Sequence, residues 1–175
     1  IADTNACWLS DALAVRSFPV ARTVTLRDRL GTLVDEIRLI AKRADLCITT
    51  GGLGPTPDDL TVDALATAAE VEFDFDERVW ARICDIYGDR VPPEVNRRQA
   101  RIPRGARALY SEIGTAPGIC LKIDRCTFIA VPGVPREMRW HFDTSIAPFL
   151  ESQPTQKRHR RTLIFTGIGE SSLST

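Results

Sequence analysis

The sequence of 175 residues lacks an excess of charge of either sign, since Lys plus Arg and Asp plus Glu both total 23. A balanced chain has no overall field that would draw it to nucleic acid or to a membrane surface. It also lacks any apolar run near the roughly 20 residues that a membrane span needs, and no signal peptide is recognisable. These absences predict a cytoplasmic protein with neither nucleic acid nor a membrane among its partners.

The cysteines lack any pattern that would indicate a disulfide framework or a metal centre. Five of them are scattered along the chain without a CxxC pair. An odd number among apolar neighbours is typical of small thiols in a reducing compartment, so we expect the cysteines in the core. The length suits one domain, and the 43% share of hydrophobic residues is ordinary for a chain with its own core.

Hydrophobic periodicity predicts helices and strands in alternation. The expected helices span residues 6–13, 30–41, 59–69, 77–87, 92–100 and 135–149. The expected strands span residues 20–26, 45–50, 118–123, 126–131 and 162–166. Asp124 and Arg125 separate two of these strands at the spacing of a hairpin. The alternation predicts an α/β fold with a mostly parallel sheet, in which ligands bind beyond the carboxyl ends of the strands.

A glycine-rich loop over residues 49–59 is the most informative stretch of the sequence. Its three glycines let backbone amides approach a ligand closely, and the start of a helix behind them favours anions. Asp58 and Asp59 follow, and two bare carboxylates would repel a phosphate unless a divalent cation lay between them. The loop therefore indicates a site for a phosphorylated small molecule.

The same loop also has a purely structural interpretation. Thr56 and Asp59 have the spacing of a helix capping box, and Pro57 would occupy the first helical position. Spacing alone favours this interpretation for both residues. The two roles are compatible, because Asp58 remains free to face the loop.

Two further loops are rich in glycine and proline, over residues 114–118 and 132–138. In a parallel sheet, the loop at 132–138 and the glycine-rich loop emerge at the same edge. Their convergence would bring Asp58, Asp59 and Glu137 together as oxygen ligands for a hard cation such as magnesium or manganese. Such a cation polarises a phosphoryl oxygen and activates water.

Five stretches then occur in order: TTGGLGPTPDDLTVDALA (49–66), NRRQARIPRGA (96–106), GTAPG (114–118), PGVPREM (132–138) and GIGESSL (167–173). Together they resemble the N-terminal domain of the competence/damage-inducible CinA family, which shares the molybdopterin-binding fold of MogA and MoaB. The resemblance implies a three-layer α/β/α sandwich that holds a nucleotide or pterin phosphate over the glycine-rich loop. It further implies a homo-oligomer.

For activity, the resemblance implies divalent-metal-dependent hydrolysis of ADP-ribose-like nucleotide pyrophosphates, with Mg, Mn or Co. The alternatives are molybdopterin binding or adenylyl transfer in molybdenum cofactor biosynthesis, and a non-catalytic nucleotide-binding module. Asp58 and Asp59 would be catalytic and would bind the metal with Glu137. The implied ligand-binding residues are Asn5, Asp28, Thr50, Gly51, Gly52, Gly54, Thr56, Asn96, Gln99, Gly114, Thr115, Pro132 and Gly133.

The sequence departs from the resembled family at both ends. The family begins with an apolar strand ending in Gly-Asp-Glu just before the segment that matches Ile1, and this first strand is missing here. We expect residues 1–161 to form the molybdopterin-binding-like domain and residues 162–175 to begin a following, truncated segment. A C-terminal amidase domain, which many family members carry, is not represented in these residues.

Several candidates keep a structural alternative. Asp28 has the position of an N-cap, and Glu137 would be stabilised by a helix dipole without any metal. Asn96 and Gln99 would equally suit a solvated helix face, while the Thr115 hydroxyl would suit its own turn. His141 is expected to pack or to lie at the surface, and His159 belongs to a basic run typical of a solvated linker.

Overall fold

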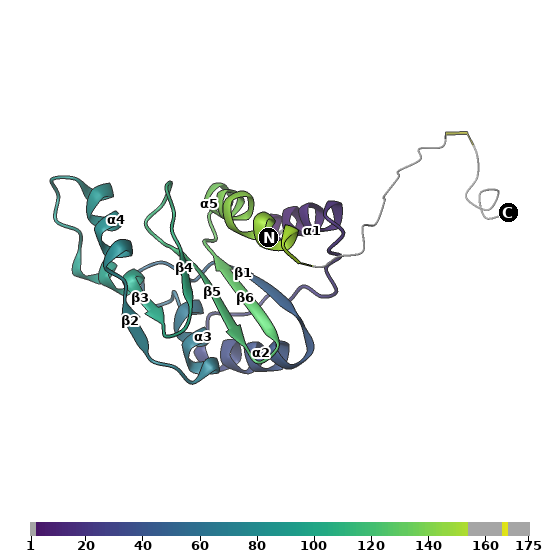
Figure 1. Ribbon diagram of the computed structural model, residues 1–175, viewed down its shortest axis with the longest axis horizontal. Helices are drawn as coiled ribbons and strands as arrows, with labels where there is room; N and C mark the ends of the chain where they lie inside the picture. Colours follow the sequence, from purple (N-terminus) through teal and green to yellow (C-terminus); the bar gives the residue numbers. More distant parts are fainter. Residues whose placement is uncertain (1–2, 154–165, 168–175) are drawn as a thin grey trace.

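The computed structural model describes residues 3–153 and 166–167 (Figure 1). Its helices are α1 (Thr4–Val15), α2 (Leu30–Arg43), α3 (Thr61–Ala69), α4 (Glu77–Tyr87), α5 (Pro135–His141) and α6 (Ala147–Glu151), with a 3-10 helix η1 (Glu94–Ala100) and a π-helical turn η2 (Phe142–Ile146). Its strands are β1 (Leu46–Thr50), β2 (Phe73–Phe75), β3 (Arg101–Pro103), β4 (Arg107–Leu109), β5 (Gly118–Ile123) and β6 (Cys126–Val131). The predicted α/β class is confirmed.

The main sheet is mixed, so the prediction of a mostly parallel sheet is wrong. Its strand order is β1-β6-β5-β4, and among the described strands only the pairing of β1 with β6 is parallel. The hairpin turn at Asp124 and Arg125 forces β5 to run antiparallel to β6, and β4 pairs antiparallel with β5. The two-residue connection predicted this hairpin at its observed boundaries, but its effect on the sheet as a whole was missed.

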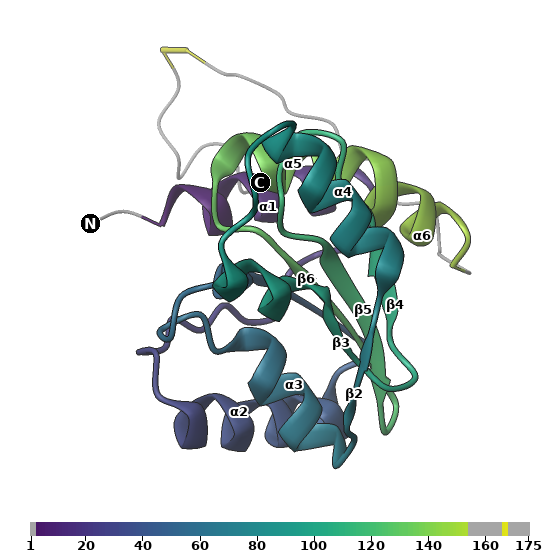
Figure 2. The ribbon, with the colours of Figure 1, turned by 90° about the vertical axis from the view of Figure 1, so that its left-hand side faces the viewer.

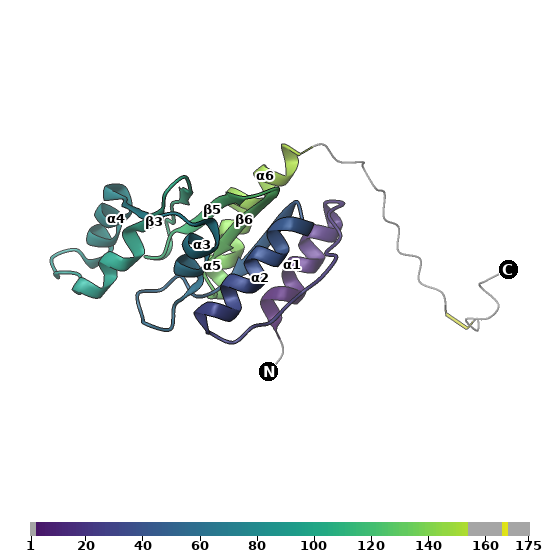
Figure 3. The ribbon, with the colours of Figure 1, turned by 90° about the horizontal axis from the view of Figure 1, so that it is seen from below.

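Helices cover both faces of the main sheet. Successive residues of β6 point to opposite faces, and each set packs against different helices. Phe128 and Ala130 of β6 pack with residues of α2 and α3 in one core cluster. Ile129 and Val131 pack with α1 and α5 in the other. Figures 1 and 2 show the same arrangement, with α2 and α3 on one side of the sheet and α1 and α5 on the other, and Figure 3 is seen from below, with α2 in front of the sheet. Two buried faces explain why the strands read as nearly continuous apolar runs.

A smaller lobe lies beside the main sheet (Figure 1), built from β2, α4, η1 and β3. Asp76 caps α4 by accepting the backbone N–H groups of Arg78 and Val79, and Gly88 ends the helix, so the predicted helix 77–87 is confirmed. The backbone N–H of Asp76 also donates to the carbonyl of Ala100 at 2.8 Å, which ties the start of α4 to the end of η1. Helix α4 therefore holds the end of η1 in place.

Several other sequence predictions are corrected by the structure. Residues 20–26 form no strand, and Val20 and Val24 are exposed because no neighbouring strand pairs with this segment. Asp28 does not cap α2, whose N-cap is Arg29 without a side-chain hydrogen bond. The three-residue strands β2, β3 and β4 were missed because three residues are too few to show a periodic pattern.

The predicted helix 135–149 is interrupted by η2, and the helix predicted from residue 59 begins at Thr61. The strand predicted over 162–166 and the proposed segment 162–175 fall almost entirely outside the described residues. Of the five cysteines, all free, Cys126 is buried and Cys7 is exposed, so the expectation of an all-core set is wrong for Cys7. Within the described part of the chain, no helix is long and apolar enough to cross a membrane.

His141 is a fully buried side chain in α5, and neither of its ring nitrogens has a hydrogen-bond partner. Burial lowers its pKa from the ordinary 6.5 to about 4. An unfolded chain therefore takes up a proton below pH 6.5 that the folded chain accepts only near pH 4. The protein should lose about 3 kcal/mol of stability across this window through His141 alone.

Two substitutions separate the pH effect from the packing effect of His141. His141→Gln should flatten the pH dependence of unfolding, since glutamine does not titrate, without a gain at neutral pH. His141→Leu should flatten it as well and raise the free energy of unfolding at neutral pH by about 1 to 3 kcal/mol, because unpartnered polar atoms are no longer buried. Urea denaturation of the three proteins at several pH values measures both effects. Parallel pH profiles for wild type and both variants would show that His141 does not titrate in this window.

Candidate functional site

The loops after β1 and β6 meet at one edge of the main sheet, as the sequence predicted for two parallel strands. The N–H of Gly51 donates to the carbonyl of Val131 at 2.9 Å. A Cβ added at Gly133 would lie 3.2 Å from the Cα of Gly51, so the two backbones are nearly in contact. The side-chain amide of Asn5, from α1, donates to the carbonyl of Gly133 at 2.8 Å. Three separate segments thus join at this point.

Positive backbone angles at Gly51 and Gly52 turn the chain from β1 toward α3. Their φ values are +92° and +69°, in a region that favours glycine. The first residue of α3, Thr61, holds the turn through its hydroxyl, which donates to the carbonyl of Gly51 at 2.8 Å, and through its N–H, which donates to the carbonyl of Gly52 at 3.1 Å. Thr50, just before the turn, is exposed.

Asp58 and Asp59 have different surroundings although they are adjacent. The Oδ2 atom of Asp59 accepts both the N–H and the hydroxyl of Thr56, at 3.0 and 2.5 Å, and the N–H of Asp59 returns to the carbonyl of Thr56 at 3.0 Å. Of these bonds, only the one from the Thr56 N–H to the Asp59 side chain belongs to a capping box, because the Thr56 hydroxyl donates to Asp59 and does not accept its N–H. The N-cap of α3 is Leu60, so the predicted capping box with Pro57 at the first helical position is wrong, and Thr56 and Asp59 close a turn ahead of the helix. Gly54 faces this carboxylate so closely that an added Cβ would lie 2.5 Å from Oδ2. Asp58 is exposed, and the nearby side chain of Thr56, together with the backbone N–H of Asp58 itself, lowers the pKa of the Asp58 carboxyl.

Asn96, Gln99 and Thr115 form a chain of polar contacts. Asn96 and Gln99 are each only 5% exposed, which excludes the solvated helix face considered for them. The amide of Asn96 donates to Gln99 Oε1 at 3.2 Å, and the amide of Gln99 donates to the hydroxyl of Thr115 at 3.4 Å. Ser111 holds the same loop by accepting the N–H groups of Ile113 and Gly114. The structure therefore links η1 to the predicted loop 114–118.

Glu137 lies against the loop before β5. A Cβ added at Gly114 would lie 2.5 Å from Glu137 Oε2, and burial raises the pKa of this carboxyl, partly offset by Arg136. No three His, Cys, Asp or Glu side chains in the described part of the chain are grouped as a metal ion would need. The expected convergence of Asp58, Asp59 and Glu137 into one ligand set is therefore not seen. Asp28 is exposed in the segment before α2.

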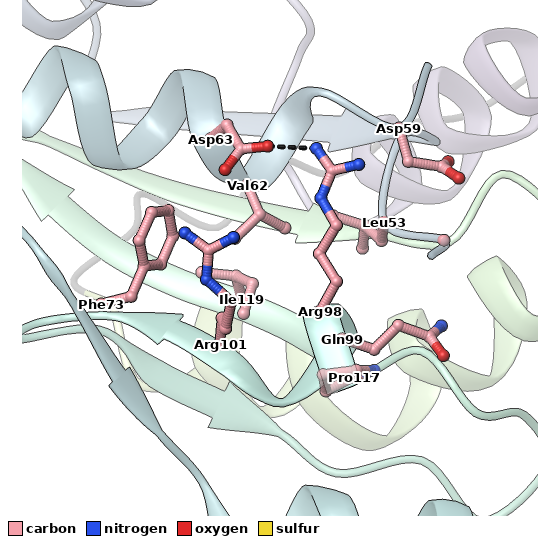
Figure 4. A pocket seen from close by; sticks show the side chains of 11 residues that line it. Leu53, Asp59, Val62, Asp63, Phe73, Arg98, Gln99, Arg101, Pro117 and Ile119 are labelled. Atoms are coloured by element: carbon pink, nitrogen blue, oxygen red, sulfur yellow. Dashed lines mark hydrogen bonds and ion pairs between the residues drawn. The ribbon is translucent and has the colours of Figure 1, made fainter. Parts of the chain in front are cut away.

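A narrow cleft beside the glycine-rich loop contains residues that sequence reasoning missed (Figure 4). Arg98 of η1 forms an ion pair with Asp63 of α3, and its other terminal nitrogen donates to the carbonyl of Thr56 at 2.6 Å. Arg101 of β3 lies over the ring of Phe73, 4.2 Å from the ring centre. The cluster of arginines in the NRRQAR stretch was the available signal for these residues. Leu53, Gly54, Asp59, Val62, Gln99, Pro117 and Ile119 complete the lining.

The family described as "Probable molybdopterin binding domain" matches residues 1–152. The chain belongs to this molybdopterin-binding domain family. Within it the domain is of CinA type: it is 38% identical over 175 residues to a competence-damage inducible protein of Caldicellulosiruptor bescii, a match covering 99% of this chain and 43% of that protein. The CinA-type domain therefore spans less than half the length of this curated relative.

Solved structures of other proteins have a fold similar to that of the CinA-type domain. The crystal structure of CinA from Thermoplasma acidophilum, a protein described as having unknown function, superposes with a TM-score of 0.79 at 29% identity, covering 86% of this chain and 88% of that one. The molybdopterin biosynthesis enzyme MoaB from Thermus thermophilus superposes with a TM-score of 0.55 at 21% identity, covering 88% of each chain. The second likeness establishes a shared MoaB-like fold and nothing about activity.

Proposed function

We propose that this CinA-type domain binds the phosphate groups of a nucleotide beside the joined loops after β1 and β6, and hydrolyses a pyrophosphate of the ADP-ribose type. The observation that supports this proposal most is the near contact of Gly51 and Gly133, which brings two glycine-containing loops to one edge of the sheet. Glycine backbones admit a phosphate closely because no side chain covers their amides. The carboxylates of Asp58 and Asp59 lie at the far end of the first of these loops.

The acidic residues suit a hydrated cation shared with the ligand rather than a cage built from protein alone. Magnesium at phosphate sites is usually held by one or two carboxylates, while waters and phosphate oxygens complete its shell. Asp58 is exposed and its lowered pKa keeps it ionised at neutral pH. Asp58 and Asp59 are therefore the residues that would hold Mg, Mn or Co. Glu137 is a poorer ligand, because it packs on Gly114 and burial raises its pKa.

Other residues of the domain position the ligand and the loops. A bound cation would neutralise phosphate charge and make a coordinated water more acidic. Asn5 keeps the Gly133 loop against α1 through its side-chain amide. The buried pair Asn96 and Gln99 holds Thr115 at the border of the site. Such supporting contacts keep a binding loop within the small range of positions that catalysis requires.

The test of this proposal is the release of AMP from ADP-ribose by the protein in separate reactions with magnesium, manganese and cobalt. We expect turnover that depends on the cation and stops when EDTA is added. The absence of turnover with all three cations would overturn the hydrolase proposal. Tight binding of ADP-ribose without turnover would instead favour a non-catalytic nucleotide-binding module.

A pterin ligand is the second candidate, and the family description, a molybdopterin binding domain, favours it. This candidate predicts tight retention of molybdopterin and, for adenylyl transfer, consumption of ATP. Binding of molybdopterin and ADP-ribose should be compared on the same preparation. Preference for the pterin together with ATP consumption would decide against pyrophosphate hydrolysis.

A further inference from the structure

The cleft beside the glycine-rich loop contains two arginine side chains to which the proposed function assigns no role. Arg98 belongs to η1, and Arg101 is the first residue of β3. In Figure 4 both side chains reach from these elements toward α3, whose residues Val62 and Asp63 line the opposite wall. Guanidinium groups present several N–H donors in a planar fork that matches phosphate oxygens.

The charges in this cleft leave a cation without a carboxylate partner. Asp63 is paired with Arg98, and Asp59 already accepts two donors from Thr56. Arg101 forms no ion pair with any described carboxylate and lies instead over the ring of Phe73. The two aspartates and the two arginines of the cleft balance in number, and the guanidinium group of Arg101 is the cation without an ion-pair partner among the described residues. This group is available to an anionic ligand.

Arg98 has one partner that a ligand can replace. Its ion pair with Asp63 joins η1 to α3, whereas its second bond, at 2.6 Å, goes to the neutral carbonyl of Thr56. A phosphate oxygen is a stronger acceptor for a guanidinium than a neutral carbonyl is. The residues at the tip of this loop, Thr56 to Asp58, are exposed, so their backbone has room to move away.

The size of the cleft shows what must happen before a phosphate enters. Its free volume is about 20 Å³, room for about one water molecule. The Thr56 carbonyl accepts the hydrogen bond from the Arg98 nitrogen that a phosphate oxygen would need. The bond from Arg98 to the Thr56 carbonyl therefore holds the glycine-rich loop beside the cleft.

We propose that Arg98 and Arg101 form a phosphate subsite, and that Arg98 exchanges the Thr56 carbonyl for an oxygen of a nucleotide pyrophosphate. Asp63 is bonded to the other terminal nitrogen of Arg98, so it does not occupy the nitrogen that takes part in the exchange. This proposal rests on the phosphorylated ligand of the proposed function, but it does not require hydrolysis. Arg98 is thus a binding residue that also couples ligand entry to the position of the loop.

Titration calorimetry in the presence of magnesium, with ADP-ribose and with inorganic pyrophosphate as separate ligands, tests the subsite. Arg98→Gln should weaken the binding of both ligands by about 10- to 100-fold, and Arg101→Gln by about 10-fold. Arg107→Gln is the matched control, because Arg107 is exposed on β4 and lies outside the cleft lining. A loss of ADP-ribose binding without a loss of pyrophosphate binding would overturn the phosphate assignment.

Asp63→Asn separates a ligand role from a structural clamp. If Arg98 binds phosphate, removing the neighbouring carboxylate charge, which repels an anion, should leave the affinity for pyrophosphate within about threefold of wild type or increase it. If the ion pair only holds the fold together, Asp63→Asn and Arg98→Gln should weaken binding equally, and the proposal fails. It also fails if the wild-type protein binds neither ligand. Binding without turnover would refute the hydrolase proposal and leave the subsite standing.

Discussion

Replacing both Asp58 and Asp59 with asparagine is expected to slow AMP release from ADP-ribose by at least about 100-fold. Asparagine keeps the size of each side chain but removes the charge that a divalent cation requires. Asp58→Asn alone should have the larger single effect, because Asp58 is exposed while Asp59 already accepts two hydrogen bonds from Thr56. Initial rates at saturating cation for wild type, both single variants and the double variant measure the effect.

The loss of activity should occur without a loss of folding. An asparagine at position 59 can still accept the two hydrogen bonds from Thr56, and its similar size keeps the close contact with Gly54. Asp35→Asn is the control for charge alone, because Asp35 is exposed on α2. Full activity in the double variant, with an unchanged unfolding midpoint, would show that these carboxylates do not hold the catalytic cation.

The parts of the fold that were predictable from sequence are those specified by local chemistry. Helix α4 has an acidic N-cap at Asp76 and a terminating Gly88, and its boundaries were predicted correctly. The β5–β6 hairpin has a two-residue connection between apolar runs, and its boundaries were also predicted. Residues 20–26 show the alternation of a strand, yet a strand needs a neighbour with free hydrogen-bonding groups, and a local pattern cannot supply one.

The candidate site likewise has a part that the sequence predicted and a part that it did not. The meeting of the loops at Gly51 and Gly133 follows from two parallel strands, which the sequence predicted. The position of Glu137 depends on where the first turn of α5 contacts the loop at Gly114, a tertiary contact with no local signal. Arg98 was overlooked because a basic cluster in a neutral chain usually indicates a solvated surface. Only the folded structure shows that one of these arginines reaches Asp63.

Gly52→Ala is expected to lower the free energy of unfolding by about 3 kcal/mol, through backbone strain and a steric clash together. The φ of +69° at Gly52 already disfavours a residue with a side chain. A Cβ there would lie 2.3 Å from the hydroxyl oxygen of Thr61 and 3.1 Å from its backbone nitrogen. The hydroxyl cannot move away without losing its bond to the carbonyl of Gly51, so the substitution also disturbs the loop that the proposed ligand contacts.

The neighbouring glycine provides the matched control, because it shares the strain but not the clash. Gly51 has a φ of +92°, and a Cβ there would meet its nearest neighbour, Gly133 Cα, only at 3.9 Å. Gly51→Ala should therefore cost about 1 to 2 kcal/mol, the strain alone. Combining Gly52→Ala with Thr61→Ala removes the hydroxyl and should give a smaller loss than the sum of the two single variants. Urea denaturation of the four variants measures these differences, and equal costs at positions 51 and 52 would show that the contact with Thr61 does not constrain the turn.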